Sequence, residues 1–133
     1  MGNDVFVSVS TGYGKILCYA CLPQVFDALC GHQSPYSAIV VISPLQALMK
    51  EQVEVLSNKG LSVIDISSDS WDLEQDIKVS MSCGNYQVIY TSPETLLNNK
   101  EWSDVFQSPA LRQHLIGIII EAHHIKKWYI LHN

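Results

Sequence analysis

The chain alternates short apolar runs with stretches whose apolar residues recur at helical spacing. The apolar runs lie at residues 5–9, 38–42, 61–66, 87–90 and 115–120, and each has the length of a strand. Amphipathic helices are predicted between them. Apolar strands separated by such helices are typical of an α/β fold with a parallel sheet that is flanked by helices on both faces. We therefore predict this fold for the chain.

Punctuating residues set the expected helix boundaries. A helix predicted from Ile16 must kink or end at Pro23, and Gly60 is a good stop for the helix before it. The polar segment 67–82 is expected to be a loop that leads into a short helix. Pro93 should open another short helix, because proline suits the first helical turn.

Polar motifs follow four of the predicted strands. They are Ser10–Lys15 after the first strand, Ser43–Leu45 after the second, Thr91–Glu94 after the fourth and Glu121–Lys127 after the fifth. Parallel strands place their carboxyl ends at one edge of the sheet, where ligands of α/β proteins bind. The order of these motifs therefore predicts one site at that edge.

The first motif has the composition of a phosphate-binding loop. Its glycines let backbone N–H groups turn inward, its lysine reaches the outer phosphates, and the N-terminus of the next helix adds a positive end. An ordinary strand-to-helix loop is the alternative interpretation. The residue after the lysine is isoleucine, where such loops carry the Ser or Thr that binds Mg²⁺. The predicted nucleotide-binding residues are Thr11, Gly12, Tyr13, Gly14, Lys15 and Ile16.

Composition fits one globular domain. The 133 residues are 47% hydrophobic and 16% charged. No apolar run reaches the length of about 18 residues that spans a bilayer, and no secretory signal is visible. We therefore expect the nucleus or cytoplasm and no membrane partner. The net charge of −5 argues against DNA binding through the whole surface but allows a local contact patch.

The cysteines leave a metal site open as an alternative. Cys18 and Cys21 have the C-x-x-C spacing of half a zinc site, and His32 lies nearby in the sequence. They lie in an apolar segment with no second ligand pair at suitable spacing, so we favour buried free thiols. Trp71 and Trp102 are interpreted as packing residues.

The four motifs together resemble the first RecA-like domain of RecQ-type DNA helicases. Ser10–Tyr19 is similar to the family's TGxGKSLCY loop, and Ser43–Gln52 is similar to its SPLxALMxDQ segment. Tyr90–Glu94 resembles the SPE element, and Glu121–Trp128 resembles DEAHCxxxW. The resemblance covers nearly the whole chain, and the second motif is the most specific of the four.

This resemblance implies an ATP-dependent 3′–5′ DNA helicase that uses Mg²⁺ and acts in DNA repair and recombination. It implies that Glu121 orients or deprotonates the attacking water and that His123 couples the nucleotide site to DNA contacts. The plain alternative for the implied DNA contacts is helix capping and surface decoration. The implied contacts to DNA, as a single strand or a tailed duplex, are Ser43, Pro44, Lys50, Gln52, Ser92 and Glu94.

Three departures from the family pattern change the expected activity. Ile16 replaces the loop serine, and the leading Asp of DEAH is missing, either substituted by Ile120 or deleted before Glu121. Those two residues hold Mg²⁺ in the family, so its ligands are expected to be lost here. We favour the deletion, which would aim Glu121 away from the nucleotide. The third departure is extent, because the upstream glutamine motif and the second RecA-like domain with its arginine finger are absent from these residues.

We therefore expect residues 1–133 to be a partial RecA-like P-loop NTPase domain. It would be the ATP-binding and nucleic-acid-binding fragment of such a helicase and inactive alone. A catalytically inactive module that binds nucleic acid or a protein is the alternative. A P-loop kinase or GTPase is disfavoured, because the SPLQALMKEQ segment has no place in those proteins.

Overall fold

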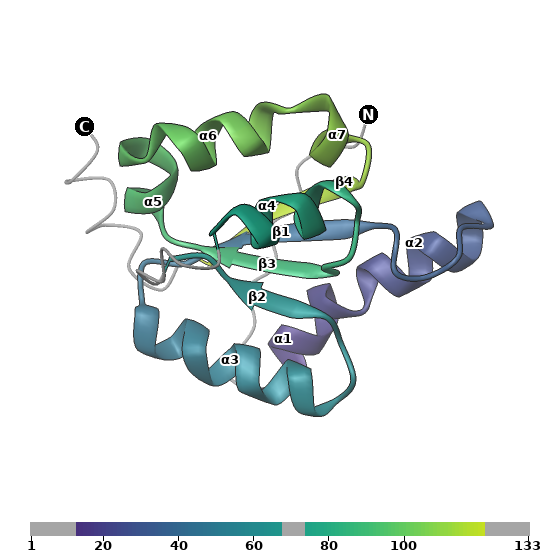
Figure 1. Ribbon diagram of the computed structural model, residues 1–133. Coiled ribbons are helices and arrows are strands. Elements are labelled where there is room, and N and C mark those ends of the chain that lie inside the picture. Colours follow the sequence, from purple (N-terminus) through teal and green to yellow (C-terminus); the bar gives the residue numbers. More distant parts are fainter. Residues whose placement is uncertain (1–12, 68–73, 122–133) are drawn as a thin grey trace.

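A parallel sheet forms the centre of the molecule. The computed structural model describes residues 13–67 and 74–121, and within them four strands pair in the order β2-β3-β1-β4 (Figure 1). All three pairings are parallel, as predicted. The strand predicted at residues 5–9 lies outside the described residues. The strands are β1 (Ala38–Ile42), β2 (Val63–Asp65), β3 (Val88–Thr91) and β4 (Leu115–Ile120).

The central strand β1 explains why the sheet is covered on both faces. Val40 lies opposite Ile89 of β3 on one side and Ile118 of β4 on the other. Successive side chains of a strand point to opposite faces. Ile39 and Val41 accordingly join one core cluster, while Val40 joins the other. A continuous β-branched run such as this one suits a strand that is buried on both faces.

Helices α1 (Tyr13–Ala20) and α3 (Gln46–Asn58) lie below the sheet in Figure 1, and α2 (Leu22–Cys30) continues from α1 to the right of the sheet. The core on this face contains Ile16 and Tyr19 of α1 and Met49 and Leu56 of α3. Helix α1 ends at Ala20, and Pro23 lies in the first turn of α2, which confirms the predicted break. The stop at Gly60 is also confirmed, because α3 ends two residues before it.

The opposite face carries α4 (Glu74–Ser82), α5 (Pro93–Asn98), α6 (Lys100–Gln107) and α7 (Pro109–Arg112) (Figure 1). The predicted helices near residue 82 and from Pro93 are confirmed, but α6 and α7 were not predicted. Both begin at capping side chains: Asn99 Oδ1 accepts from the Trp102 N–H at 3.2 Å, and Ser108 Oγ accepts from the Leu111 N–H at 3.4 Å.

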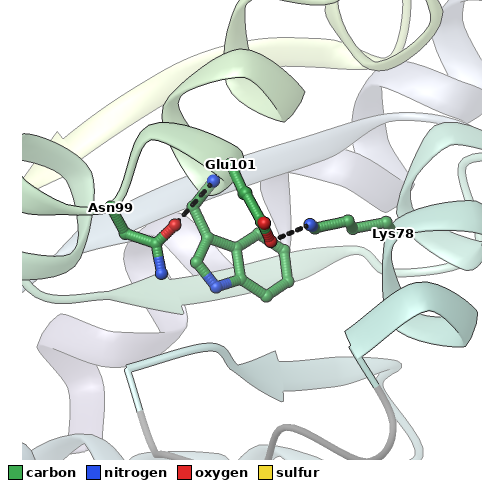
Figure 2. Close-up of polar contacts among 4 residues, drawn as sticks. Lys78, Asn99 and Glu101 are labelled. Carbon is green, nitrogen blue, oxygen red and sulfur yellow. Dashed lines mark hydrogen bonds and ion pairs between the residues drawn. The ribbon is translucent and has the colours of Figure 1, made fainter.

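Trp102 anchors α6 to this second core. Its side chain is buried against residues of the sheet and of α4, which confirms that it is a packing residue. Figure 2 shows Lys78 of α4 reaching toward Glu101, with 3.1 Å between Nζ and Oε2. The Lys78 Nζ also lies 5.3 Å from the centroid of the Trp102 ring. Because the Glu101 side chain is 63% exposed, solvent weakens the ion pair, and the buried indole contributes most of the attachment.

The prediction of buried thiols is wrong. Cys18, Cys21, Cys30 and Cys83 are all free and exposed. In α1, the core-facing stripe consists of Ile16, Tyr19 and Ala20, so that Cys18 lies outside it. Within the described ranges, no three His, Cys, Asp or Glu side chains gather closely enough to hold a metal ion, and no helix is long and apolar enough to cross a membrane. Trp71 lies outside the described residues.

Candidate functional site

Three of the predicted motifs meet at the carboxyl edge of the sheet. Ile42 of β1 pairs with Thr91 of β3 and with Ile120 of β4, so the residues that follow these strands are neighbours. Backbone hydrogen bonds continue past the strand ends: the Ser43 N–H donates to the Thr91 carbonyl, and the Glu121 N–H donates to the Ile42 carbonyl, both at 3.0 Å. The parallel register therefore brings the three motifs together.

A buried polar cluster joins this edge to the helices beneath it. The Tyr19 hydroxyl lies 2.9 Å from the Tyr90 hydroxyl, 2.9 Å from Glu121 Oε1 and 3.3 Å from Gln52 Oε1. These residues come from α1, β3, the end of β4 and α3, and no member is more than 6% exposed. We call these four residues the Tyr19 cluster. Each of them belongs to a different one of the four segments that resemble the helicase family, which are Ser10–Tyr19, Ser43–Gln52, Tyr90–Glu94 and Glu121–Trp128.

Strand alternation explains the orientation of Glu121. Ile119 packs into the core on the side of α1, and Glu121 is two residues further along, so its side chain is on the same face. Ile118 and Ile120 face the other side and are 63% and 56% exposed. The carboxylate is thus directed toward α1, the helix that follows the predicted phosphate loop. The expectation that a deletion would aim Glu121 away from the nucleotide stays a prediction, because Tyr19 lies in the last turn of α1 and the predicted phosphate loop precedes the first turn.

Both tyrosines of the cluster are held in their protonated form. Burial raises the pKa of Tyr19, and the neighbouring Tyr90 and Glu121 raise it further. Burial also raises the pKa of Tyr90, although its hydrogen bond with Tyr19 opposes the rise and Glu121 adds to it. The two hydroxyls are therefore neutral hydrogen-bond donors at physiological pH.

The residues predicted to contact DNA differ in how far their side chains are exposed to solvent. Lys50 and Glu94 are exposed, and Pro44 is half-buried. Ser43, Gln52 and Ser92 are buried. Direct contact between Gln52 and a nucleic acid needs its side chain to leave the Tyr19 cluster.

The two buried serines make local hydrogen bonds. Ser43 Oγ accepts from the Leu45 N–H at 3.4 Å. Ser92 is the N-cap of α5, and its Oγ accepts from the Thr95 N–H at 3.2 Å. The helix start that Pro93 and Glu94 predicted is thereby stabilised by Ser92.

The start of α1 shows where part of the predicted phosphate loop lies. The helix begins at Tyr13, so the backbone of Gly14 and Lys15 lies in its first turn, whose N–H groups have no partner inside a helix. Thr11, Gly12 and His123 lie outside the described residues. Ile16 is only 7% exposed and packs in the core, and its alkyl side chain offers a Mg²⁺ ion no oxygen.

Sequence reasoning missed the roles of Tyr19 and Tyr90. A tyrosine at a core position of a helix or buried strand is usually read as packing. The available signal was the phenolic hydroxyl, which needs a partner when it is buried. Gln52 carries the same signal, because an amide on the core-facing stripe of α3 also needs a buried partner.

Comparison with known proteins agrees with the arrangement of the motifs. The model of the family described as DEAD/DEAH box helicase matches residues 1–132. The chain belongs to this helicase family. Its similarity is to the RecQ-type members in particular, as the individual relatives show.

ATP-dependent helicase wrn-1 of Caenorhabditis elegans is 34% identical over 128 residues, which are 96% of this chain and 11% of that protein. ATP-dependent DNA helicase RecQ of Haemophilus influenzae is 33% identical over 96% of this chain and 19% of that protein. ATP-dependent helicase SGS1 of Saccharomyces cerevisiae is 33% identical over 96% of this chain and 9% of that protein. The chain therefore spans a fifth or less of the length of these relatives.

Proposed function

We propose that this chain is the ATP-binding and nucleic-acid-binding part of a RecQ-like 3′–5′ DNA helicase. The observation that carries the proposal is the Tyr19 cluster, in which four motifs that are far apart in the sequence meet through side-chain hydrogen bonds. Such convergence at the carboxyl edge of a parallel sheet is typical of a ligand site in an α/β protein. DNA is the proposed partner, and the nucleus or cytoplasm is the proposed location.

The nucleotide phosphates would bind at the N-terminus of α1. ATP, when bound, supplies the phosphoanhydride bond whose hydrolysis drives helicase movement. The first-turn N–H groups of α1 would hold the phosphates, and Lys15 would neutralise their charge. Glu121 would orient the attacking water, and His123 would couple this site to the nucleic acid. Lys50 is exposed on α3 and would contact the DNA backbone.

We infer that Mg²⁺ is poorly held. Ile16 contributes packing in place of a hydroxyl ligand, and the leading Asp carboxylate is missing before Glu121, where Ile120 stands. The residues at these two positions do not fit an octahedral ion that needs fixed oxygen ligands. Nucleotide binding should therefore be weak and nearly independent of the metal, because the backbone N–H groups and Lys15 act without it.

Calorimetric titration with ADP, with and without Mg²⁺, tests the proposal. We expect measurable ADP binding whose affinity Mg²⁺ changes by less than about threefold. A contribution of about 1.4 kcal/mol from the metal would already change the affinity tenfold. Lys15→Ala should weaken binding, whereas Lys59→Ala should not, because Lys59 is an exposed residue at the C-cap of α3. Absence of ADP binding would refute the nucleotide site. A large gain with Mg²⁺ would show that another residue holds the ion.

A catalytically inactive binding module is the second candidate. It is favoured by Ile16 in the core and by the hydrogen bond that engages Glu121 with Tyr19. This candidate expects binding of single-stranded DNA or of a protein without ATP turnover. Phosphate release measured with and without single-stranded DNA separates the two, because turnover above the buffer rate excludes the inactive module.

A further inference from the structure

The Tyr19 hydroxyl has more oxygen neighbours than it has protons. It lies 2.9 Å from Glu121 Oε1, 2.9 Å from the Tyr90 hydroxyl and 3.3 Å from Gln52 Oε1. A phenol has one O–H to donate and two lone pairs that accept. Tyr19 can therefore donate to Glu121 or to Gln52, but not to both at once.

Two hydrogen-bond arrangements in which Tyr90 donates to Tyr19 follow from this count. In the first, Tyr19 donates to Glu121 and accepts from Tyr90, while the Gln52 amide turns its NH₂ group toward the phenol oxygen. In the second, Tyr19 donates to Gln52 Oε1, still accepts from Tyr90, and no longer holds the carboxylate. The charged acceptor and the shorter distance favour the first arrangement in this structure.

Gln52 connects the Tyr19 hydroxyl to α3. Gln52 is fixed to a helix of 13 residues that begins three residues after Ser43 and carries the exposed Lys50 on its outer side. Hydrogen bonds from a hydroxyl to an oxygen usually span about 2.5–3.0 Å, so the 3.3 Å contact with Gln52 is already long. A small movement of α3 toward or away from α1 would therefore change the competition between Gln52 and Glu121 for one proton.

We propose that Tyr19 is a positioning residue that sets the Glu121 carboxylate according to the place of α3. Nucleic acid bound at Lys50 would thereby change affinity at the nucleotide site, and the nucleotide would change affinity for nucleic acid by the same factor. This inference rests on the proposed function. Its physical basis is one hydroxyl that lies within reach of two competing acceptors on different elements, at 2.9 Å from Glu121 Oε1 and 3.3 Å from Gln52 Oε1.

The test measures the coupling of the two ligands on the full chain. The affinity for a fluorescent ADP is determined with and without a saturating (dT)₂₀ oligonucleotide. We expect the wild-type chain to show a change of at least about fivefold. Tyr19→Phe removes only the hydroxyl and should reduce this change to less than about twofold, because the proton that Glu121 and Gln52 share is gone.

Two further variants make the result specific. Gln52→Leu should also abolish the coupling, because it removes the competing acceptor and leaves Tyr19 bonded to Glu121. Tyr36→Phe is the matched control and should keep the wild-type coupling. Tyr36 uses its ring to stack on His32 and its backbone to contact Asp27 and His114, all of which phenylalanine retains. Thermal unfolding followed by circular dichroism confirms that each variant is folded.

The outcomes separate this inference from the proposed function. If folded Tyr19→Phe or Gln52→Leu keeps the wild-type coupling, the inference is overturned and the proposed function stands. The same holds if the wild-type chain binds both ligands without coupling. If the wild-type chain binds neither ligand, the proposed function fails, and this inference fails with it.

Discussion

Ile16 illustrates how a single residue can serve packing at a position where the family uses chemistry. Its side chain lies in the core with Tyr19 and Ala20 on α1 and with Ile39 and Val41 on β1. A serine there would bury a hydroxyl and leave a cavity in that cluster. Replacing a buried isoleucine by so small a residue costs about 2–5 kcal/mol of unfolding free energy.

Repair of the metal site should need two changes. We expect Ile16→Ser together with an Asp inserted between Ile120 and Glu121 to restore Mg²⁺-linked nucleotide binding, at the stability cost given above. The inserted Asp would take the position of Glu121, which faces α1, whereas Ile120→Asp would place the carboxylate on the opposite, exposed face. Calorimetry with and without Mg²⁺ measures the effect.

Each single change should do little, because one anchor fixes an octahedral ion poorly. Ile16→Val is the control for packing and should leave metal dependence unchanged. The interpretation is wrong if Ile16→Ser with Ile120→Asp restores Mg²⁺-linked binding and the insertion variant does not.

Asp27 should make stability depend on pH. It is 2% exposed, and its two carboxylate oxygens accept from the N–H groups of Ser37 at 2.9 Å and Tyr36 at 3.1 Å. Burial acts to raise its pKa, but the hydrogen bonds from Ser37 and Tyr36 outweigh burial and hold the pKa below the usual value of 3.8. The carboxylate therefore stabilises the fold above that usual value, and this stabilisation is lost as the pH falls through the lower native pKa.

Asp27→Asn should lower the unfolding free energy by about 1.5–3 kcal/mol at pH 7, the range for hydrogen bonds to a charged group. The difference from the wild-type chain should shrink below about pH 4, where the unfolded wild-type carboxyl is protonated. Urea unfolding at pH 7 and pH 3 measures both values. Asp104→Asn, at an exposed position of α6, should change neither by more than about 0.5 kcal/mol. An equal loss for Asp27→Asn at both pH values would contradict the proposed role of the charge.

For single residues, the sequence could predict which of them belong to the motifs but not which of their side chains are in contact. Glu121 was singled out because a carboxylate after an apolar strand has few other reasons to be there. The partner of Glu121 is Tyr19, and this pairing depends on where α1 packs across the sheet. Gln52 was predicted to contact DNA at the surface. The sequence does not reveal that Gln52 faces the core, because packing of α3 against the sheet determines which residues of the helix are buried.

Among the elements, strands were easier to predict than the helices after β3. The apolar run of β4 has the predicted bounds, whereas β2 keeps only three of the six residues predicted for it. β2 lies at the edge of the described sheet, where only one neighbour supplies backbone partners. Helices α6 and α7 depend on caps and on one buried tryptophan, which are local signals in an otherwise polar segment.

A side chain added at Gly84, in the turn after α4, should destabilise the fold. Gly84 has φ +76, and a Cβ there would lie 2.6 Å from Nδ1 of His114, whose ring is hydrogen-bonded to the Tyr36 carbonyl at 2.8 Å. Gly60 has φ +87, but no described atom lies within 4 Å of its Cβ position. Gly60→Ala should therefore cost about 1–2 kcal/mol for the left-handed backbone alone, and Gly84→Ala about 1–3 kcal/mol more for the overpacking.

Denaturant midpoints of the two glycine variants provide the measurement. Equal losses would show that the His114 ring moves aside without cost. If the loss at Gly84 is the larger one, as we expect, a combined variant with His114→Ala should recover part of it and none of the loss at Gly60, because only Gly84 involves a steric contact.

For the whole molecule, we predict that the purified 133-residue polypeptide unwinds no tailed DNA duplex. Helicase movement needs two bodies that open and close on the nucleotide, and the described residues form one sheet with a core on each face. Poorly held Mg²⁺ should also lower ATP turnover, because the ion neutralises charge that develops during phosphoryl transfer. A strand-displacement assay with a full-length RecQ helicase as positive control checks this, and displacement by the 133-residue chain alone would refute the prediction.

The central place of β1 has a consequence for how the molecule opens. This strand is hydrogen-bonded to β3 on one side and to β4 on the other, and Ala38–Val41 are at most 3% exposed. Its amides should be among the last to exchange with deuterated solvent, on the timescale of global unfolding, while three-residue β2 exchanges earlier through local fluctuations. Ser43 follows directly on β1, the strand whose amides should exchange most slowly, and α3 begins three residues later. Thermal fluctuations that loosen the periphery should therefore leave one end of α3 in register with the sheet.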